Sequence, residues 1–140
     1  MAEDSQKTYL EYQFLQQAIA QMHQKKAIIQ NQMSEFFGLM ENLESLKNSK
    51  KDSQIYAAIG SGVFVRAELK EKDNVLVNIG SNVALERSVQ DAKKLVANQL
   101  DELKSLLKQL DADIEENIRH TNFLGKKLSE AQVKPHEHKH

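Results

Sequence analysis

The sequence predicts a mainly helical α+β protein, in which two long helices form an antiparallel coiled-coil hairpin and two β-hairpins lie between them. Three observations predict this fold. Proline occurs once in 140 residues, at position 135, so long helices can run unbroken. Apolar residues follow a heptad spacing in both outer thirds of the chain. Between these thirds the spacing changes to strict alternation, which is typical of strands.

The first helix is expected over residues 5–48, where apolar residues recur in steps of three and four. This is the a and d pattern by which two helices bury a common seam. Lysines replace apolar residues at two a positions, and we expect Lys26 to reach Asp111 or Asp113 across the hairpin and help to fix its register. The seam positions are Tyr12, Ile19, Lys26, Met33, Met40 and Lys47 at a, and Leu15, Met22, Ile29, Phe36 and Leu43 at d.

The second helix is expected over residues 88–132. Ser88 suits the N-cap, and Asp91 three residues later completes a pattern like the capping box. The similar lengths of the two helices indicate that they lie antiparallel. Residues 1–135 are therefore expected to form a single domain, followed by a disordered, His-rich tail over residues 133–140. The apolar stripe of the second helix is Val89, Ala92, Val96, Leu100, Leu103, Leu107, Leu110 and Ile114, continued by Asn117, Thr121, Leu124 and Leu128.

Four short strands fit the central window, at about residues 54–59, 63–69, 74–79 and 83–87. Gly60, Gly62 and Gly80 supply positive φ at the turns of two β-hairpins within residues 54–87. Strands so short leave edges unpaired and one face uncovered, which invites another chain. We therefore expect the hairpins to join a β-platform built with partner subunits. The residues expected to make that contact are Val63, Phe64, Val65, Val75, Leu76, Val77 and Ile79.

The composition excludes several classes of function. The chain has no cysteine, which excludes a disulfide framework, a thiolate metal site and a cysteine nucleophile. Its 19 basic and 20 acidic side chains give a net charge of -1, so no overall field draws it onto nucleic acid or acidic lipid. No apolar run reaches the roughly 18 residues of a membrane span, and the N-terminus lacks a signal-peptide pattern. A cytoplasmic protein is expected.

The sequence also lacks the common motifs of catalysis. It contains no GxxxxGK[ST] loop for nucleotides, no HExxH pair for zinc and no Ser-His-Asp arrangement that spacing supports. His136, His138 and His140 alternate beyond Pro135, where a polar tail would not hold them in place for a metal. We therefore expect no enzymatic activity, no metal and no other cofactor.

The sequence resembles the prefoldin family. Within that family it resembles the alpha class, which has two β-hairpins, and it is of archaeal type. The resemblance rests on the segments Ile59-Gly60-Ser61-Gly62, Val77-Asn78-Ile79-Gly80-Ser81 and Leu85-Glu86-Arg87-Ser88. It implies a hetero-hexamer of two alpha and four beta subunits, whose hairpins build a double β-barrel platform from which six coiled coils project. It further implies that non-native client proteins are held at the coiled-coil ends and passed to a group II chaperonin without ATP.

Apolar side chains outside the seam gather near the free ends of both helices. Leu10 falls at heptad position f and Phe14 at c, away from the a and d stripe. Because a protein that holds unfolded chains needs exposed apolar surface, we expect clients to bind here. The expected client-binding residues are Tyr9, Leu10, Tyr12, Phe14, Leu15, Ile118, Phe123, Leu124 and Leu128. For Tyr12, Leu15, Leu124 and Leu128, simple closure of the coil is an equal alternative.

Two other functions are compatible with a coiled-coil hairpin. A scaffold or adaptor subunit of a prefoldin-like complex, without client capture, would be expected to have polar helix ends. A coiled-coil arm that binds nucleic acid is disfavoured by the charge balance, and salt-sensitive retention on DNA or RNA would support it.

The glycine at position 125 lowers helix stability by about 1 kcal/mol and is expected to loosen the free end, whereas Gly38 has no such explanation.

Overall fold

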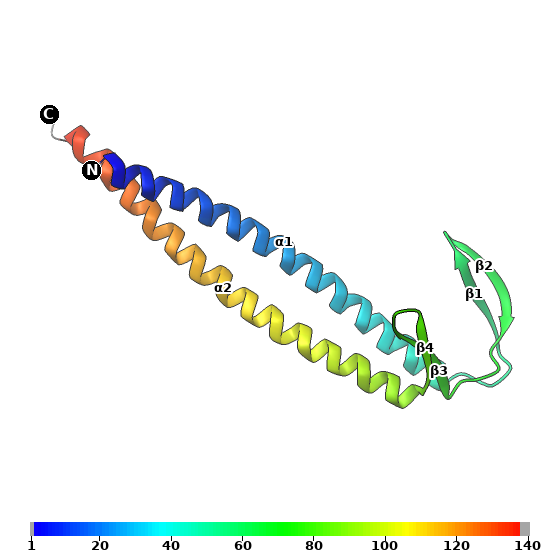
Figure 1. The fold of residues 1–140 in the computed structure, drawn as a ribbon. Helices are drawn as coiled ribbons and strands as arrows, with labels where there is room; N and C mark the ends of the chain where they lie inside the picture. Colours follow the sequence, from blue (N-terminus) through cyan, green and yellow to red (C-terminus); the bar gives the residue numbers. More distant parts are fainter. Residues whose placement is uncertain (1, 138–140) are drawn as a thin grey trace. The chain divides into compact units, whose positions relative to one another are not determined.

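The structure, a computed structural model, describes residues 2–137 of the chain. It contains two long helices with four strands between them, as the sequence predicts (Figure 1). The chain divides into two compact units. We call residues 1–32 with 103–140 the terminal unit, and residues 33–102 the central unit. The elements are α1 (Ala2–Lys47), β1 (Gln54–Gly60), β2 (Val63–Glu68), β3 (Asn74–Gly80), β4 (Val83–Ser88) and α2 (Val89–Glu137).

The ends of the helices differ from those predicted. Helix α1 begins at Ala2 rather than at residue 5, and α2 ends at Glu137 rather than near residue 132. The earlier end was expected because proline lacks a backbone N–H and disfavours a helical residue before it. In the structure α2 nevertheless continues for two residues past Pro135. The last part of that tail, residues 138–140, lies outside the described residues.

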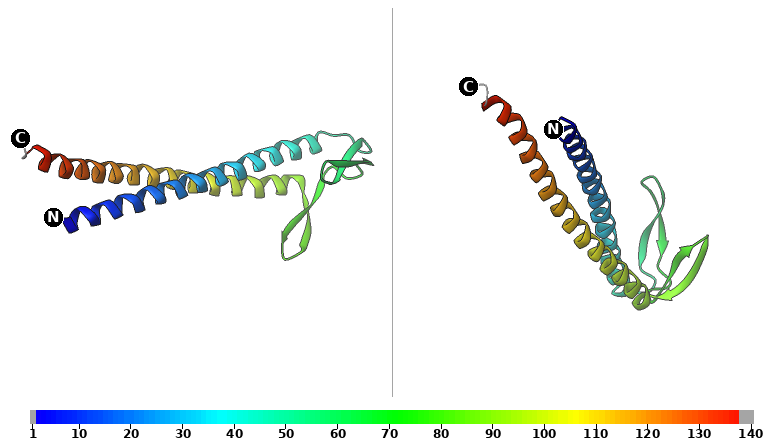
Figure 2. Two further views of the ribbon diagram at one scale, coloured as in Figure 1. Left: turned by 90° about the horizontal axis from the view of Figure 1, so that it is seen from above. Right: turned by 60° about the vertical axis from the view of Figure 1, so that its left-hand side comes forward.

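In the terminal unit the first part of α1 runs antiparallel to the last part of α2 (Figures 1 and 2). Residues of the predicted seam are its buried side chains: Leu15 and Ile29 from α1, and Leu110, Ile114, Thr121 and Leu124 from α2. The Lys26 ammonium lies 2.7 Å from an Asp111 carboxylate oxygen, which confirms the expected cross-coil pair. The heptad pattern therefore places both the apolar and the charged seam residues.

Gly125 lies beside Tyr12, one of the predicted seam residues. A Cβ built at Gly125 would lie 3.3 Å from the ring carbon Cε2 of Tyr12, whereas one at Gly38 would have nothing within 4 Å. The Tyr12 ring therefore occupies the space that a larger residue at position 125 would fill. This packing contact gives Gly125 a role that the sequence alone does not indicate.

The two helical glycines give a matched pair of stability predictions. We expect Gly38→Ala to raise the free energy of unfolding by about 1 kcal/mol, because alanine favours helix over glycine by this amount and nothing crowds its methyl group. Gly125→Ala should gain clearly less, because Tyr12 must move. Urea unfolding of both variants, followed by circular dichroism, measures the difference. Equal gains would show that the Tyr12 ring does not disfavour a side chain larger than glycine at position 125.

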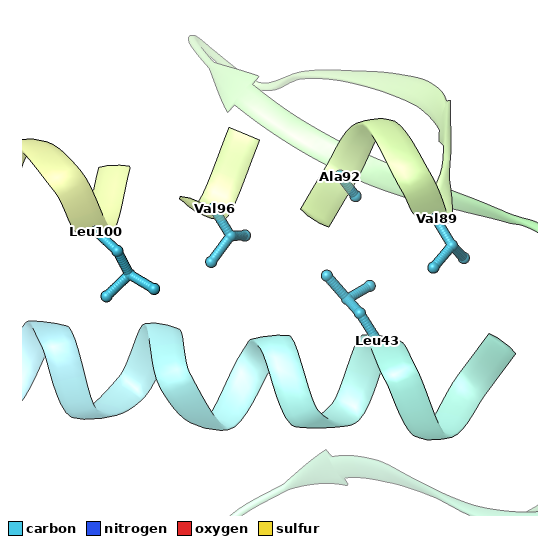
Figure 3. Packing of buried hydrophobic residues seen from close by; sticks show 5 residues of the cluster. All are labelled: Leu43, Val89, Ala92, Val96 and Leu100. Carbon is cyan, nitrogen blue, oxygen red and sulfur yellow. The ribbon is translucent and has the colours of Figure 1, made fainter. Parts of the chain in front are cut away.

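The central unit contains the main cluster of buried apolar residues. Leu43 of α1 forms one cluster with Val89, Ala92, Val96 and Leu100 of α2, and it lies opposite Val89 and Ala92 (Figure 3). All five belong to the two predicted helical stripes. Partly buried residues surround this cluster, and two of them come from β3 rather than from the helices. These surrounding residues are Met33, Phe36, Met40, Leu46, Val75 and Val77.

Polar contacts hold the start of α2 and the coil beside it. The backbone N–H of Asp91 donates to the Ser88 hydroxyl at 3.0 Å, which confirms Ser88 as the N-cap. Across the coil, Lys93 pairs with Glu44 and lowers the pKa of that carboxyl, by a hydrogen bond first and by its charge second. A carboxylate whose pKa is lowered by folding favours the folded state above its unfolded pKa. That contribution is lost as the pH falls through the lowered value.

The strands form two separate antiparallel hairpins, β1–β2 and β3–β4. Both registers shift just before the turn, between Ala58 and Gly60 in the first hairpin and between Asn78 and Gly80 in the second. The φ angles of Gly60, Gly62 and Gly80 are 141°, 80° and 105°, a region that L-residues rarely adopt. Ser61, Ser81 and Asn82 also have positive φ. These glycines therefore lie where the turns require them.

Candidate functional site

The candidate site is a group of exposed apolar side chains in the terminal unit, which we call the free-end cluster. The largest exposed fractions are 70% for Phe14, 62% for Leu10 and 61% for Phe123. A single exposed apolar residue is ordinary, but a group on adjoining helices is not. The members of the cluster are Tyr9, Leu10 and Phe14 of α1, and Ile118 and Phe123 of α2.

The helical repeat explains why these side chains face outward. The seam of α1 is occupied here by Tyr12 and Leu15, so Leu10 and Phe14, four residues apart, share a different face of the helix. The Tyr9 hydroxyl accepts a hydrogen bond from the Gln13 amide at 3.1 Å, which holds its ring along the helix surface. The apolar side chains are therefore presented by a rigid helix rather than by a loop.

Contacts across the coil bring the two halves of the cluster to the same level. The Tyr12 ring lies at Gly125, and Glu11 lies 3.6 Å from a ring nitrogen of His120. On α2 these contacts lie on either side of Phe123, and on α1 they lie two and three residues before Phe14. The two phenylalanines therefore belong to one end of one coiled coil, although far apart in sequence.

Four of the residues expected to bind clients lie instead in the seam. Leu15 and Leu124 are buried, and Tyr12 and Leu128 are half-buried. Because these side chains pack against the opposite helix, a closed coil does not offer them to a client. Closure of the coil is thus the interpretation that the structure favours for all four.

The terminal unit also contains a hollow that no apolar pattern in the sequence indicates. Its volume is about 390 Å³, and it lies between the start of α1 and the end of α2. Most of its lining side chains are polar or charged, and only Leu128 and Ala131 are apolar. No apolar pattern could have indicated it, because it arises only from the pairing of the two helices. Its lining residues are Asp4, Ser5, Lys7, Thr8, Glu11, Lys127, Leu128 and Ala131.

Positive charge lies at the edge of the cluster. The Lys127 ammonium is 6.0 Å from the centroid of the Phe123 ring, the outer limit of a cation–π contact.

Among the described residues, no group of histidine and acidic side chains could hold a metal ion. The histidines at 138 and 140 lie outside these residues. Neither helix, over the same described part of the chain, is apolar enough over a sufficient length to cross a membrane.

The residues expected to build the platform fall into two groups. Val63, Phe64, Val65, Leu76 and Ile79 are exposed. Val75 and Val77 are half-buried, because β3 packs them against the central cluster of the same chain. The helices of the same chain therefore cover part of the surface that the sequence assigns to partner subunits.

Comparison with known proteins agrees with this architecture. The family model described as Prefoldin subunit matches residues 15–134. Prefoldin subunit alpha of Pyrococcus horikoshii is 28% identical over 130 residues, covering 92% of this chain and 88% of that protein. Prefoldin subunit alpha of Methanoregula boonei is 30% identical over 120 residues, covering 81% and 78%.

A solved structure shows the same fold. One chain of the cryo-EM structure of filamentous PFD from Methanocaldococcus jannaschii superposes with a TM-score of 0.73 at 18% identity, covering 87% of this chain and 98% of that one. Two long helices joined through paired β-hairpins are thus the architecture of a prefoldin-like chaperone subunit. The chain belongs to the prefoldin family. Its resemblance to the alpha class is confirmed by relatives that carry that name.

Proposed function

We propose that the chain is an ATP-independent holdase subunit that captures non-native proteins with its free-end cluster. The observation that carries this proposal is the exposure of Leu10, Phe14 and Phe123 outside the buried seam of the coil. Apolar surface kept in water favours any partner that covers it. Unfolded chains expose apolar side chains that native proteins bury, so they are the partners that this surface selects.

The energetics suit reversible holding rather than permanent binding. Full burial of one Leu or Phe side chain contributes about 1.5–3 kcal/mol, and ordering a flexible client opposes it. A single coil therefore binds weakly, and several coils on one platform raise the effective concentration at each end. Binding and release of this kind need neither ATP nor catalysis.

The hairpins support the second part of the proposal, which is assembly. We infer that this alpha-class chain joins beta-class prefoldin subunits, as two alpha and four beta chains, in the cytoplasm. Exposed apolar residues on both hairpins and unpaired strand edges favour association. Delivery of captured clients to a group II chaperonin completes the proposed activity. An adaptor without client capture would not require apolar side chains at the coil end.

Co-purification with a beta-class subunit from the same source tests this function. We expect light scattering and native mass measurement to show a hetero-hexamer that suppresses aggregation of a refolding client without ATP, whereas the beta-class subunit alone suppresses it less. A matched sample with apyrase added controls for residual nucleotide. A chain that stays monomeric beside the beta-class subunit would contradict the assembly, and a hexamer with no effect on aggregation would contradict client capture.

A further inference from the structure

One methionine of the coiled-coil seam lies in polar surroundings. Three methionines of α1 occupy seam positions, and all three are half-buried. Met33 and Met40 pack against the apolar cluster around Leu43, the usual setting for this flexible side chain. Met22 belongs to the terminal unit instead, and its sulfur lies 3.8 Å from the side-chain nitrogen of Asn117 on α2.

The side-chain amide of Asn117 directs a donor at this sulfur. An amide nitrogen carries two N–H donors. In Asn117 this nitrogen donates to the backbone carbonyl of Asp113 at 2.9 Å and to the Met22 sulfur at 3.8 Å. A thioether is only a weak acceptor, so the second donor is poorly satisfied.

A second donor in the same stretch of the seam has no partner at all. Thr121 is 8% exposed, and its hydroxyl makes no hydrogen bond among the described residues. It lies one turn after Asn117 on the same face of α2. Side chains tilt toward the N-terminus of their own helix, and α1 and α2 run in opposite directions (Figure 1). Met22 and Thr121 therefore tilt toward each other.

Both donors lack a strong acceptor beside the Met22 sulfur. Oxidation of a methionine to the sulfoxide supplies one, because it attaches a polar oxygen to that sulfur. In an apolar core this change is disruptive, as expected for Met33 and Met40, which pack among apolar side chains. At Met22 the same oxygen would meet an amide and a hydroxyl. Buried polar groups are tolerated when they are hydrogen-bonded.

We propose that Met22 is a site of reversible oxidation by a peroxide, and that the Asn117 amide and the Thr121 hydroxyl bind the sulfoxide oxygen inside the closed coil. With hydrogen peroxide, a lone pair of the sulfur attacks one peroxide oxygen and the O–O bond breaks. The other oxygen leaves as water with both peroxide protons. The sulfur loses two electrons, which the peroxide gains, and methionine sulfoxide reductases restore the thioether.

This chemistry affects how the coil responds to oxidants. The terminal unit carries the free-end cluster as well as Met22. A seam that stays closed after oxidation keeps that cluster on paired helices. Oxidation at Met22 is therefore expected to leave the terminal unit folded, whereas oxidation of the methionines around Leu43 loosens the central unit.

A set of full-length variants isolates the site. The reference variant carries Met33→Leu and Met40→Leu, so that Met22 is its only seam methionine. Leucine is similar in size to methionine and has no sulfur to oxidise. Each folded chain is treated with hydrogen peroxide, and peptide mass spectrometry locates every added oxygen. Urea unfolding, followed by circular dichroism, gives the midpoint before and after the treatment.

We expect Met22 to be oxidised in the folded reference variant with little change in its midpoint. Adding Asn117→Leu and Thr121→Val removes both donors and leaves an apolar seam, which needs no hydrogen-bond partner. Before oxidation this donor-free variant should be at least as stable as the reference. After oxidation its midpoint should fall at least several-fold further, and methionine sulfoxide reductase should reverse the fall.

The matched control exchanges the methionines. Met22→Leu, with Met33 and Met40 kept, should lose stability on oxidation, because those two side chains pack against apolar residues. If this control is as insensitive to peroxide as the reference variant, the surroundings of Met22 have no special effect and the proposal is wrong.

Two further results would overturn the proposal. Equal falls in the midpoint of the reference and donor-free variants would show that Asn117 and Thr121 do not bind the sulfoxide oxygen. A folded chain in which Met22 stays a thioether, although peroxide oxidises it in the urea-unfolded chain, would show that the closed coil does not admit the reaction.

Discussion

Replacing Leu10, Phe14 and Phe123 together by serine should weaken the binding of an unfolded client at least about tenfold. Each of these side chains is more than half exposed, so its removal leaves no cavity in the seam and should change stability little. The lost apolar contacts, at about 1.5–3 kcal/mol for each fully buried side chain, exceed the 1.4 kcal/mol that corresponds to a tenfold change in affinity. Suppression of aggregation of a refolding client by the assembled complex provides the measurement.

The control removes apolar side chains from the same unit but not from its free end. Ile28 and Leu106 are 58% and 53% exposed, and Ile28→Ser with Leu106→Ser reduces apolar surface without touching the free-end cluster. This variant should protect the client as well as the wild type does. If both variants lose protection equally, general hydrophobicity of the coil is responsible; if neither loses it, the cluster does not bind clients.

The seam was predictable from the sequence because burial in a coiled coil follows a local repeat. Leu15, Ile29 and Leu43, spaced by 14 residues, are the buried d positions of α1. The Lys26–Asp111 pair was predictable for the same reason, since the register of one contact fixes the others. Where a periodic pattern determines the neighbours of a side chain, the sequence is sufficient.

Other features depend on which surfaces meet, and no periodic pattern carries that information. Alternation indicates that Val75 and Val77 share one face of β3, but not that the face packs on the same chain's helices. From the sequence alone Gly125 appears only as a residue that weakens the helix. The structure shows that the Tyr12 ring lies where a larger side chain at position 125 would be. For the same reason the apolar residues near the free ends divide into seam and surface only once the coil is closed.

The division into two units separates the proposed binding and assembly surfaces along the chain. The free-end cluster lies in the terminal unit, whereas both hairpins lie in the central unit. Exposed residues in one unit can therefore be changed without altering the contacts of the other. This makes client capture and assembly separable by mutation, and a change in the central core should impair assembly.

Leu43→Ala should destabilise the central unit by about 2–5 kcal/mol, the usual range for leucine truncation in a core. Leu43 is the α1 member of a cluster whose other four buried residues all come from α2 (Figure 3). We expect the lower part of the range, because two helices can close around a lost side chain more readily than a thick core can. The midpoint of urea unfolding, followed by circular dichroism, measures this loss.

The same substitution should also impair assembly, because Val75 and Val77 pack against the cluster that contains Leu43. A loosened β3 would disturb the second hairpin, which is proposed to take part in assembly, so the assembled fraction should fall together with stability. Leu43→Met keeps the volume and should cost less than about 1.5 kcal/mol, while Leu106→Ala, on an exposed position, should cost less still. If Leu43→Ala is no more destabilising than Leu106→Ala, the cluster does not hold the central unit together, and the link between core packing and assembly is wrong.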